Sequence, residues 1–208
     1  MAMKHYGIQD SLELYGVREW GYGYFGINSK GHLEVFPTRD ENLSCDLHDV
    51  VTQLRKKGVQ TPLVLRFPQI LSSRVTELNE AFRKAMKAYD YEGDYQGVFP
   101  VKTNQVKEVV DQVAKAGYKY RYGLEAGSKP ELMIALSMNL HEDAMVLCNG
   151  YKDETFIRMA LLARKAGRNV LITVEKMTEL PLILKVAKEL KVDPLLGLRF
   201  KLAEKKKK

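Results

Sequence analysis

The sequence has 208 residues, 45% of them apolar and 28% charged, which is ordinary for a globular protein with one good-sized core or two small ones. Its formal net charge is +7, but residues 205–208 are four lysines, so the basic balance is only a weak sign of nucleic-acid binding. No apolar run has signal-peptide or membrane-spanning length, and the two cysteines lack metal-ligand spacing, so we expect a cytoplasmic protein that binds neither membrane nor nucleic acid.

The first 60 residues are predicted to form a small β-rich segment. Residues 22–28 and 32–36 flank a three-residue loop that ends on Gly31, a pattern typical of an antiparallel hairpin. A short helix is predicted over residues 46–57, where apolar residues recur on one face. Ser44 is the expected cap of this helix and Gly58 its expected stop.

From residue 61 to residue 203, short apolar runs alternate with helical patterns. The runs predicted as strands are residues 63–67, 97–101, 122–126, 144–148, 169–174 and 196–200. The expected helix caps are Ser72 or Ser73, Thr178, and Ser128, which forms a capping box with Glu131. Strands that recur about every 25 residues with one helix between neighbours are typical of βα units that build a parallel sheet.

The predicted strands leave two α/β folds open. A (β/α)8 barrel and a doubly wound open sheet share this rhythm, and periodicity does not separate them. No glycine-rich dinucleotide or P-loop motif follows any of the strands. Counted from Val98, the chain holds five strands, whereas a closed barrel needs eight. Residues 97–101 and 196–200 are then expected to be the edge strands, and residues 204–208 form a lysine-rich tail.

Polar residues gather at the predicted carboxyl ends of successive strands, where ligands and catalytic groups collect in parallel sheets. They are Lys102, Glu125, Asn149, Gly150, Glu175 and Arg199. A lysine amine can condense with an aldehyde, and nearby carboxylates and a guanidinium can hold and tune an anionic cofactor. The plainer interpretation is that Glu125 accepts a backbone N–H, Glu131 completes its capping box and Arg199 makes a strand-end ion pair. For Glu131 and Glu175 we favour that structural interpretation.

Several blocks of sequence resemble the biosynthetic arginine decarboxylases, in order and in spacing. They are residues 67–71 (FPQIL), 93–95 (GDY), 98–105 (VFPVKTNQ), 123–133 (GLEAGSKPELM), 148–153 (CNGYKD) and 174–177 (VEKM). The resemblance extends from about residue 15 to residue 203 and places the chain among the fold-type III pyridoxal-phosphate decarboxylases. It therefore implies a partial (β/α)8 barrel of the alanine racemase and ornithine decarboxylase type, with about five of the eight strands.

The resemblance also implies a chemistry. Lys102 corresponds to the lysine that forms the imine with pyridoxal 5′-phosphate, and Glu125, Glu131 and Arg199 correspond to residues on the cofactor side of the barrel. The implied reaction converts L-arginine to agmatine and carbon dioxide, which leads to putrescine and spermidine. Family members usually require magnesium and form homo-oligomers, although nothing in this sequence indicates a magnesium site.

The chain departs from the family by stopping after the fifth barrel strand. The phosphate-binding turn, the remaining strands and the C-terminal β-domain of the family are absent from it. We therefore predict a truncated chain without useful decarboxylase activity. The alternative is a non-catalytic, decarboxylase-like regulatory or binding module, and nucleic-acid binding through the lysine tail ranks last because no aromatic residues accompany it.

Overall fold

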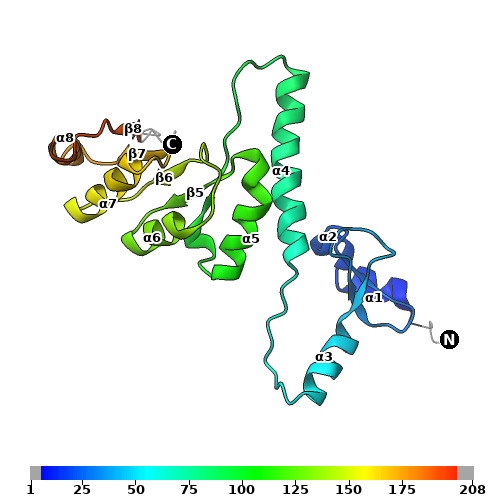
Figure 1. Ribbon diagram of the computed structural model, residues 1–208. Helices are drawn as coiled ribbons and strands as arrows, with labels where there is room; N and C mark the ends of the chain where they lie inside the picture. The colour runs from blue at the N-terminus through cyan, green and yellow to red at the C-terminus, as the bar shows by residue number, and fades with distance from the viewer. Residues whose placement is uncertain (1–5, 201–208) are drawn as a thin grey trace, which may run out of the picture. The chain divides into compact units, whose positions relative to one another are not determined.

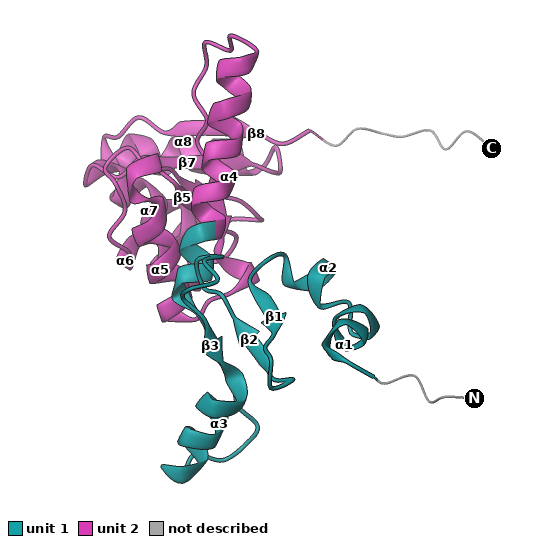
Figure 2. Ribbon diagram, turned by 90° about the vertical axis from the view of Figure 1, so that its right-hand side faces the viewer, with its two compact units in different colours: residues 1–73 teal, residues 74–208 magenta. Residues whose placement is uncertain are grey.

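A computed structural model of the protein describes residues 6–200, which fall into two compact units (Figures 1 and 2). The N-terminal unit comprises Met1–Ser73 and the C-terminal unit Arg74–Lys208. Among the described residues, no helix has the length and apolar character needed to cross a membrane. The predicted lysine-rich tail at 204–208 lies outside the described residues.

In the N-terminal unit, residues 6–56 form a three-stranded antiparallel sheet and three helices. Its elements are α1 (Ile8–Leu14), α2 (Val17–Gly21), β1 (Phe25–Ile27), β2 (Leu33–Val35), β3 (Cys45–Asp46) and α3 (Leu47–Lys56). The predicted hairpin is confirmed, since β1 pairs with β2 with Gly26 opposite Glu34. Gly31 in its loop has a φ of 79°, which is readily accessible to glycine but uncommon for other residues.

Helix α3 confirms the predicted helix but corrects its cap. Asp46, and not Ser44, is the N-cap residue, and its Oδ1 accepts the backbone N–H groups of His48 at 2.9 Å and Asp49 at 3.2 Å. A carboxylate at this position accepts hydrogen bonds from backbone N–H groups that have no partner within the helix. It also interacts favourably with the positive end of the helix dipole. Gly58 follows the helix with a φ of 83°, as expected of a stop. Sequence periodicity did not predict α1 or α2.

The C-terminal unit is built on five parallel strands. Its elements are α4 (Pro68–Ala88, which begins in the N-terminal unit), β4 (Val98–Pro100), η1 (Val101–Thr103), α5 (Lys107–Gly117), η2 (Tyr118–Tyr120), β5 (Gly123–Ala126), α6 (Lys129–Ser137), β6 (Val146–Cys148), α7 (Glu154–Lys165), β7 (Val170–Val174), α8 (Glu179–Leu190) and β8 (Leu195–Leu198). The strand order is β4-β5-β6-β7-β8, so β4 and β8 are the edges, as predicted.

This strand order decides between the two folds that periodicity left open. In a doubly wound sheet the order of the strands reverses at a switch point. Here each strand after β4 lies beside the strand that precedes it in sequence, without such a reversal. Right-handed crossovers between such neighbours place all the helices on one face, as in a (β/α) barrel. The sheet is therefore a five-stranded portion of a barrel-type fold.

The core of the C-terminal unit lies between this sheet and its helices. Leu124, Val146 and Ile172 of the strands are at most 1% exposed, and Ile157 of α7 and Ile183 of α8 are fully buried with them. These residues come from successive βα units, so each helix is fixed to the sheet by apolar burial. The carboxyl ends of the strands are thereby held as one rigid rim.

Two further predictions of local structure were wrong, and a third was confirmed only in position. Residues 63–67 form no strand: they pair with no other segment of the described chain, and Val64 is 75% exposed. Helix α4 begins at Pro68, so Ser72 lies inside it and donates its hydroxyl to the carbonyl of Pro68 at 3.3 Å instead of capping. Thr178 occupies the N-cap position of α8, but its side chain makes no capping hydrogen bond.

Candidate active site

A pocket of about 350 Å³ opens at the carboxyl ends of the parallel strands. It is lined by Lys102, Glu125, Gly127, Glu131, Asn149, Gly150, Tyr151, Glu175 and Arg199. The structure thus brings together all of the polar rim residues singled out in the sequence. They converge because parallel strands with successive connections end at the same edge of the sheet.

Lys102 lies in the short helical turn η1 that directly follows β4. Val101 anchors this turn because it is fully buried, whereas Lys102 is exposed. Among residues 6–200 the structure records no hydrogen bond or ion pair from the Lys102 amine, although it lines the pocket with three carboxylates. An amine without a fixed partner is available to a ligand in this pocket.

Glu125 occupies the end of β5 and is only 4% exposed. Its Oε1 accepts a hydrogen bond from Asn149 Nδ2 at 3.1 Å, so β5 and the loop after β6 are joined at this point. Its Oε2 is buried and has no hydrogen-bond partner in the described part of the chain. A buried carboxylate oxygen without a donor is unfavourable by about 1–3 kcal/mol or more, so a ligand with a polar hydrogen would complete this site.

Glu131 lies in the first turn of α6 and is 9% exposed. Ser128 Oγ accepts the backbone N–H of Glu131 at 3.4 Å, which is one half of the predicted capping box. The other half is corrected: the Glu131 carboxylate accepts the backbone N–H of Gly127 at 2.7 Å instead of that of Ser128. Its second oxygen faces Gln105 Nε2 at 3.4 Å. Glu131 therefore fixes the loop after β5 while it lines the pocket.

Glu175 follows β7 and pairs with Arg199 at the end of β8. Arg199 Nη1 donates to both carboxylate oxygens at 3.1 Å, and Glu175 Oε1 also accepts the backbone N–H of Gly150 at 2.8 Å. Burial alone would raise the pKa of Glu175, but the Gly150 N–H and the Arg199 guanidinium outweigh it and lower that pKa. Arg199 therefore makes the predicted strand-end ion pair, and both members of the pair line the pocket.

A buried ion pair between Lys152 and Glu179 was not predicted from the sequence. The side chains of Lys152 and Glu179 are 0% and 5% exposed, with Lys152 Nζ 3.4 Å from Glu179 Oε2. Glu179 also accepts the backbone N–H groups of Lys152 and Glu175, each at 2.9 Å, and Lys152 Nζ donates to the carbonyl of Gly150. The pair therefore ties the loops after β6 and β7 together.

Gly150 lets two of the rim loops approach closely. It has a φ of 75°, and a Cβ at this position would lie 2.8 Å from the carbonyl oxygen of Gly127. Both the backbone conformation and the contact therefore favour glycine. This close approach places Asn149 beside Glu125 and Tyr151 at the edge of the pocket.

The donors and acceptors at this pocket fit one part of pyridoxal phosphate. Lys102 offers an amine for an aldehyde, and Glu125 Oε2 offers an unsatisfied acceptor for a polar hydrogen of a ring. The backbone N–H groups of Gly127 and Gly150 are already donated to Glu131 and Glu175. These two N–H groups therefore cannot bind a phosphate, and the residues that line the pocket fit the aldehyde and ring of the cofactor better than its phosphate.

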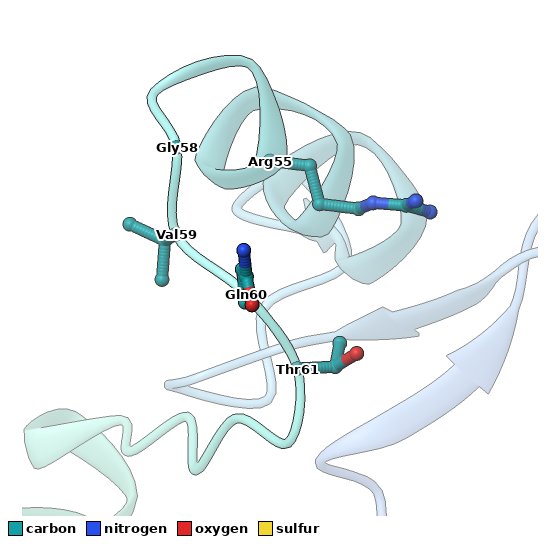
Figure 3. A pocket seen from close by; sticks show the side chains of 5 residues that line it. All are labelled: Arg55, Gly58, Val59, Gln60 and Thr61. Carbon is teal, nitrogen blue, oxygen red and sulfur yellow. The ribbon is translucent and has the colours of Figure 1, made fainter.

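A second concavity, of about 410 Å³, lies in the N-terminal unit after α3. It is lined by Arg55, Gly58, Val59, Gln60 and Thr61, and the Arg55 side chain extends away from Val59 (Figure 3). No carboxylate or imidazole of the described residues lines it. This pocket therefore lacks the acid–base groups that the rim pocket gathers.

Comparison with known proteins gives matches over nearly the whole chain. A biosynthetic arginine decarboxylase from Deinococcus radiodurans is 50% identical over 193 residues, which are 93% of this chain and 29% of that protein. The crystal structure of the biosynthetic arginine decarboxylase from Campylobacter jejuni matches with a TM-score of 0.78 and 34% identity, covering 88% of this chain and 30% of that one. Diaminopimelate decarboxylase from M. jannaschi shares the fold, with a TM-score of 0.63 at 22% identity.

The chain spans about 30% of the length of the arginine decarboxylases that it matches. The family model "Pyridoxal-dependent decarboxylase, pyridoxal binding domain" matches residues 75–208, which include the five parallel strands and every residue that lines the rim pocket. This match covers more than half of the chain. The chain therefore belongs to the pyridoxal-dependent decarboxylase family, through its pyridoxal binding domain.

Proposed function

We propose that this chain is the lysine-bearing part of a biosynthetic arginine decarboxylase, which converts L-arginine to agmatine and carbon dioxide on the way to spermidine. The observation that carries the proposal is one pocket that holds both the unpaired amine of Lys102 and the buried, unpaired Oε2 of Glu125. The relative from Deinococcus radiodurans, 50% identical and named biosynthetic arginine decarboxylase, supports the choice of substrate.

Each site residue has a distinct proposed role. Lys102 supplies the amine that takes up the cofactor's aldehyde, and Glu125 Oε2 accepts a hydrogen from the cofactor. Glu131 holds the Gly127 loop, and Arg199 holds Glu175 against Gly150. When bound, pyridoxal phosphate supplies an electron sink for the charge that develops on the substrate's α-carbon as carbon dioxide leaves.

For the 208 residues alone, we propose cofactor uptake without turnover. The Gly127 and Gly150 N–H groups are occupied by carboxylates, so they leave the cofactor's phosphate without these two donors. Release of labelled carbon dioxide from arginine, at a rate abolished by Lys102→Ala, would contradict this proposal. The alternative of a non-catalytic binding module predicts instead that the chain captures a full-length decarboxylase in a pull-down.

The remaining properties of the family are also part of the proposal. We propose a division into a β-rich segment at 1–60, a partial barrel at 61–203 and a tail at 204–208. We also propose that the full-length protein is a homo-oligomer. A cytoplasmic location is proposed as well, and the free thiols of Cys45 and Cys148 support it. A magnesium requirement stays a prediction. Among residues 6–200 the one group of possible metal ligands includes two imidazoles, which do not suit Mg²⁺.

The proposal is tested by trapping the cofactor. The purified chain is incubated with pyridoxal 5′-phosphate and reduced with borohydride, and the modified lysine is located by peptide mass spectrometry. We expect the modification at Lys102, its loss in Lys102→Ala, and weaker uptake in Glu125→Ala. Lys129→Arg is the matched control, since Lys129 is an exposed lysine of the same unit that pairs with Asp153. Equal modification of Lys102 and Lys129 would refute a specific site.

A further inference from the structure

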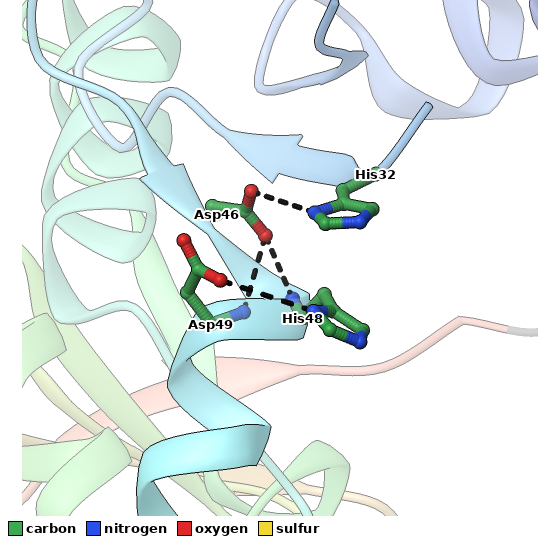
Figure 4. A group of neighbouring side chains, drawn as sticks. All are labelled: His32, Asp46, His48 and Asp49. Atoms are coloured by element: carbon green, nitrogen blue, oxygen red, sulfur yellow. Dashed lines mark hydrogen bonds and ion pairs between the residues drawn. The ribbon is translucent and has the colours of Figure 1, made fainter. Parts of the chain in front are cut away.

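The N-terminal unit gathers two imidazoles and two carboxylates at one end of its small sheet. His32, Asp46, His48 and Asp49 each offer one possible ligand atom, and these atoms all lie within 4.8 Å of one another (Figure 4). The fold creates this group because β2 and β3 pair with Glu34 opposite Asp46. His32, just before β2, then lies near the first turn of α3, which carries His48 and Asp49.

Two of these side chains are held in place by hydrogen bonds. His32 Nδ1 lies 2.9 Å from Asp46 Oδ2, and the same oxygen accepts Asn28 Nδ2 at 2.8 Å. The side chains of His32 and Asp46 are 27% and 15% exposed, so the pair is partly shielded from water. His32 would bind a metal ion through Nδ1 in the tautomer that carries its hydrogen on Nε2, so the ion would take the place of the hydrogen bond between Nδ1 and Asp46.

The other two side chains are exposed and able to adjust. His48 Nδ1 lies 3.8 Å from Asp49 Oδ1, too far for a hydrogen bond, and the rings of His48 and His32 are 4.3 Å apart at a tilt of 32°. Neutral imidazole is the form that binds metal ions, and two such rings lie side by side here. Lys30 Nζ, 3.8 Å from Asp49 Oδ2, is a weak exposed competitor.

We propose that His32, Asp46, His48 and Asp49 form a site for Zn²⁺ or a similar first-row divalent cation. In a tetrahedral zinc site with bonds of about 2.0–2.2 Å, neighbouring ligand atoms are roughly 3.3 Å apart. The observed spacings of 2.9 and 3.8 Å lie on either side of that value, so small rotations of the exposed His48 and Asp49 would complete the site. Two imidazoles with two carboxylates suit zinc and not magnesium or calcium. This site is independent of the proposed function.

The proposal is tested by isothermal titration of the 208-residue chain with zinc chloride, and separately with magnesium chloride. We expect one zinc ion per chain, and no binding of magnesium at the same concentration. His48→Ala and Asp49→Asn should each weaken zinc binding at least tenfold. Both side chains are exposed, so circular dichroism should show an unchanged fold.

His141→Ala is the matched control. His141 Nδ1 lies 3.7 Å from Asp143 Oδ2, much like the His48–Asp49 pair, but it belongs to no group of three or more possible ligands among residues 6–200. Zinc affinity should therefore be unchanged in this variant. Equal affinity in the wild type and His48→Ala, or loss of binding only in Cys45→Ser or His5→Ala, would overturn the site, as would the absence of zinc binding.

A spectroscopic measurement distinguishes an ordered site from loose association. Cobalt(II) in place of zinc should give the intense visible absorption of a tetrahedral centre, and His48→Ala should abolish it. Cobalt that binds with only weak octahedral absorption, identical in His48→Ala, would contradict the proposal.

Discussion

In the C-terminal unit, strands and helices bury a continuous set of apolar side chains that runs from Val101 to Ala187 along the chain. Among residues 6–73 of the N-terminal unit, the buried apolar side chains are Val17, Tyr24 and Val35. That unit relies more on polar contacts, such as those of Asp46 with His32, Asn28 and the start of α3. The stability of the two units should therefore depend on different properties. The C-terminal unit should be sensitive to loss of core volume and to unpaired buried charge, and the N-terminal unit should be sensitive to pH.

The largest expected effect is that of breaking the buried ion pair in the C-terminal unit. Lys152→Met leaves Glu179 buried without its cation, which should destabilise this unit by about 3–5 kcal/mol. Lys185→Met is the control: the Lys185 side chain is 59% exposed and its Nζ lies 3.4 Å from Glu154 Oε2, so we expect a change below about 1 kcal/mol. Urea denaturation followed by segment-resolved hydrogen exchange measures both. Equal losses would show that burial of the pair is unimportant.

Removing volume from the core of the same unit should have the next largest effect. Ile157 of α7 is fully buried, so Ile157→Ala should cost about 2–5 kcal/mol of unfolding free energy. Leu162→Ala on the same helix, at a position 48% exposed, should change stability far less. Hydrogen exchange should show the loss in residues 98–198 and not in residues 25–56. A loss shared by both units would mean that they unfold together.

A smaller effect is expected where two rim loops meet. Gly150→Ala forces a residue with a Cβ into a φ of 75° and against the carbonyl of Gly127, at a cost on the order of 1–3 kcal/mol. Gly167→Ala is the control, because Gly167 has a similar φ of 93° but nothing within 4 Å of its Cβ position. Gly150→Ala should also weaken trapping of pyridoxal phosphate at Lys102, and Gly167→Ala should not. Equal trapping of pyridoxal phosphate in the two variants would show that the Gly150 loop does not contribute to cofactor binding.

The smallest expected effect is a pH dependence of the N-terminal unit. Desolvation opposes ionisation of Asp46, but hydrogen bonds from His32, Asn28 and the Asp49 N–H hold its pKa well below the ordinary 3.8. A lowered folded pKa means that this carboxylate stabilises the unit above pH 3.8 and that the contribution is lost as the pH falls below that value. Thermal unfolding followed by Trp20 fluorescence should show this loss in the wild type.

In Asp46→Asn the acid-induced part of the change should be reduced, because residue 46 no longer titrates. Trp20 is the only tryptophan of the chain and packs against Phe25 in the same unit, so its fluorescence reports this unit. His141→Ala, in the other unit, should leave the pH profile unchanged. An identical pH dependence of unfolding in Asp46→Asn and the wild type would show that ionisation of Asp46 does not stabilise the unit.

The comparison of the units also explains what could be read from the sequence. Strands β4 to β8 were predicted because burial on both faces leaves short apolar runs, and the gathering of Lys102, Glu125 and Arg199 followed from the shared edge of a parallel sheet. In the N-terminal unit the same signal misled, since residues 63–67, which are apolar except for Arg66, form no strand. There, apolar character predicted neither burial nor a pairing partner, since Val64 is 75% exposed.

Contacts between residues distant in sequence could not be predicted. The Lys152–Glu179 pair and the group around His32 depend on which loops the fold brings together, and no local spacing encodes that. Local competition also escaped prediction: Asp46 capped α3 ahead of Ser44, and Glu131 bonded Gly127 ahead of Ser128. In both cases two nearby groups were chemically suitable, and backbone geometry selected between them.

The strand order of the larger sheet has a consequence for how the protein is made. Because β5, β6, β7 and β8 each pair with the strand synthesised just before it, every new βα unit can dock on its predecessor as soon as the ribosome releases it. Such sequential pairing keeps loop closures short and favours rapid assembly. The residues that line the pocket with Lys102, from Glu125 to Arg199, can thus be added one strand at a time in the order of synthesis.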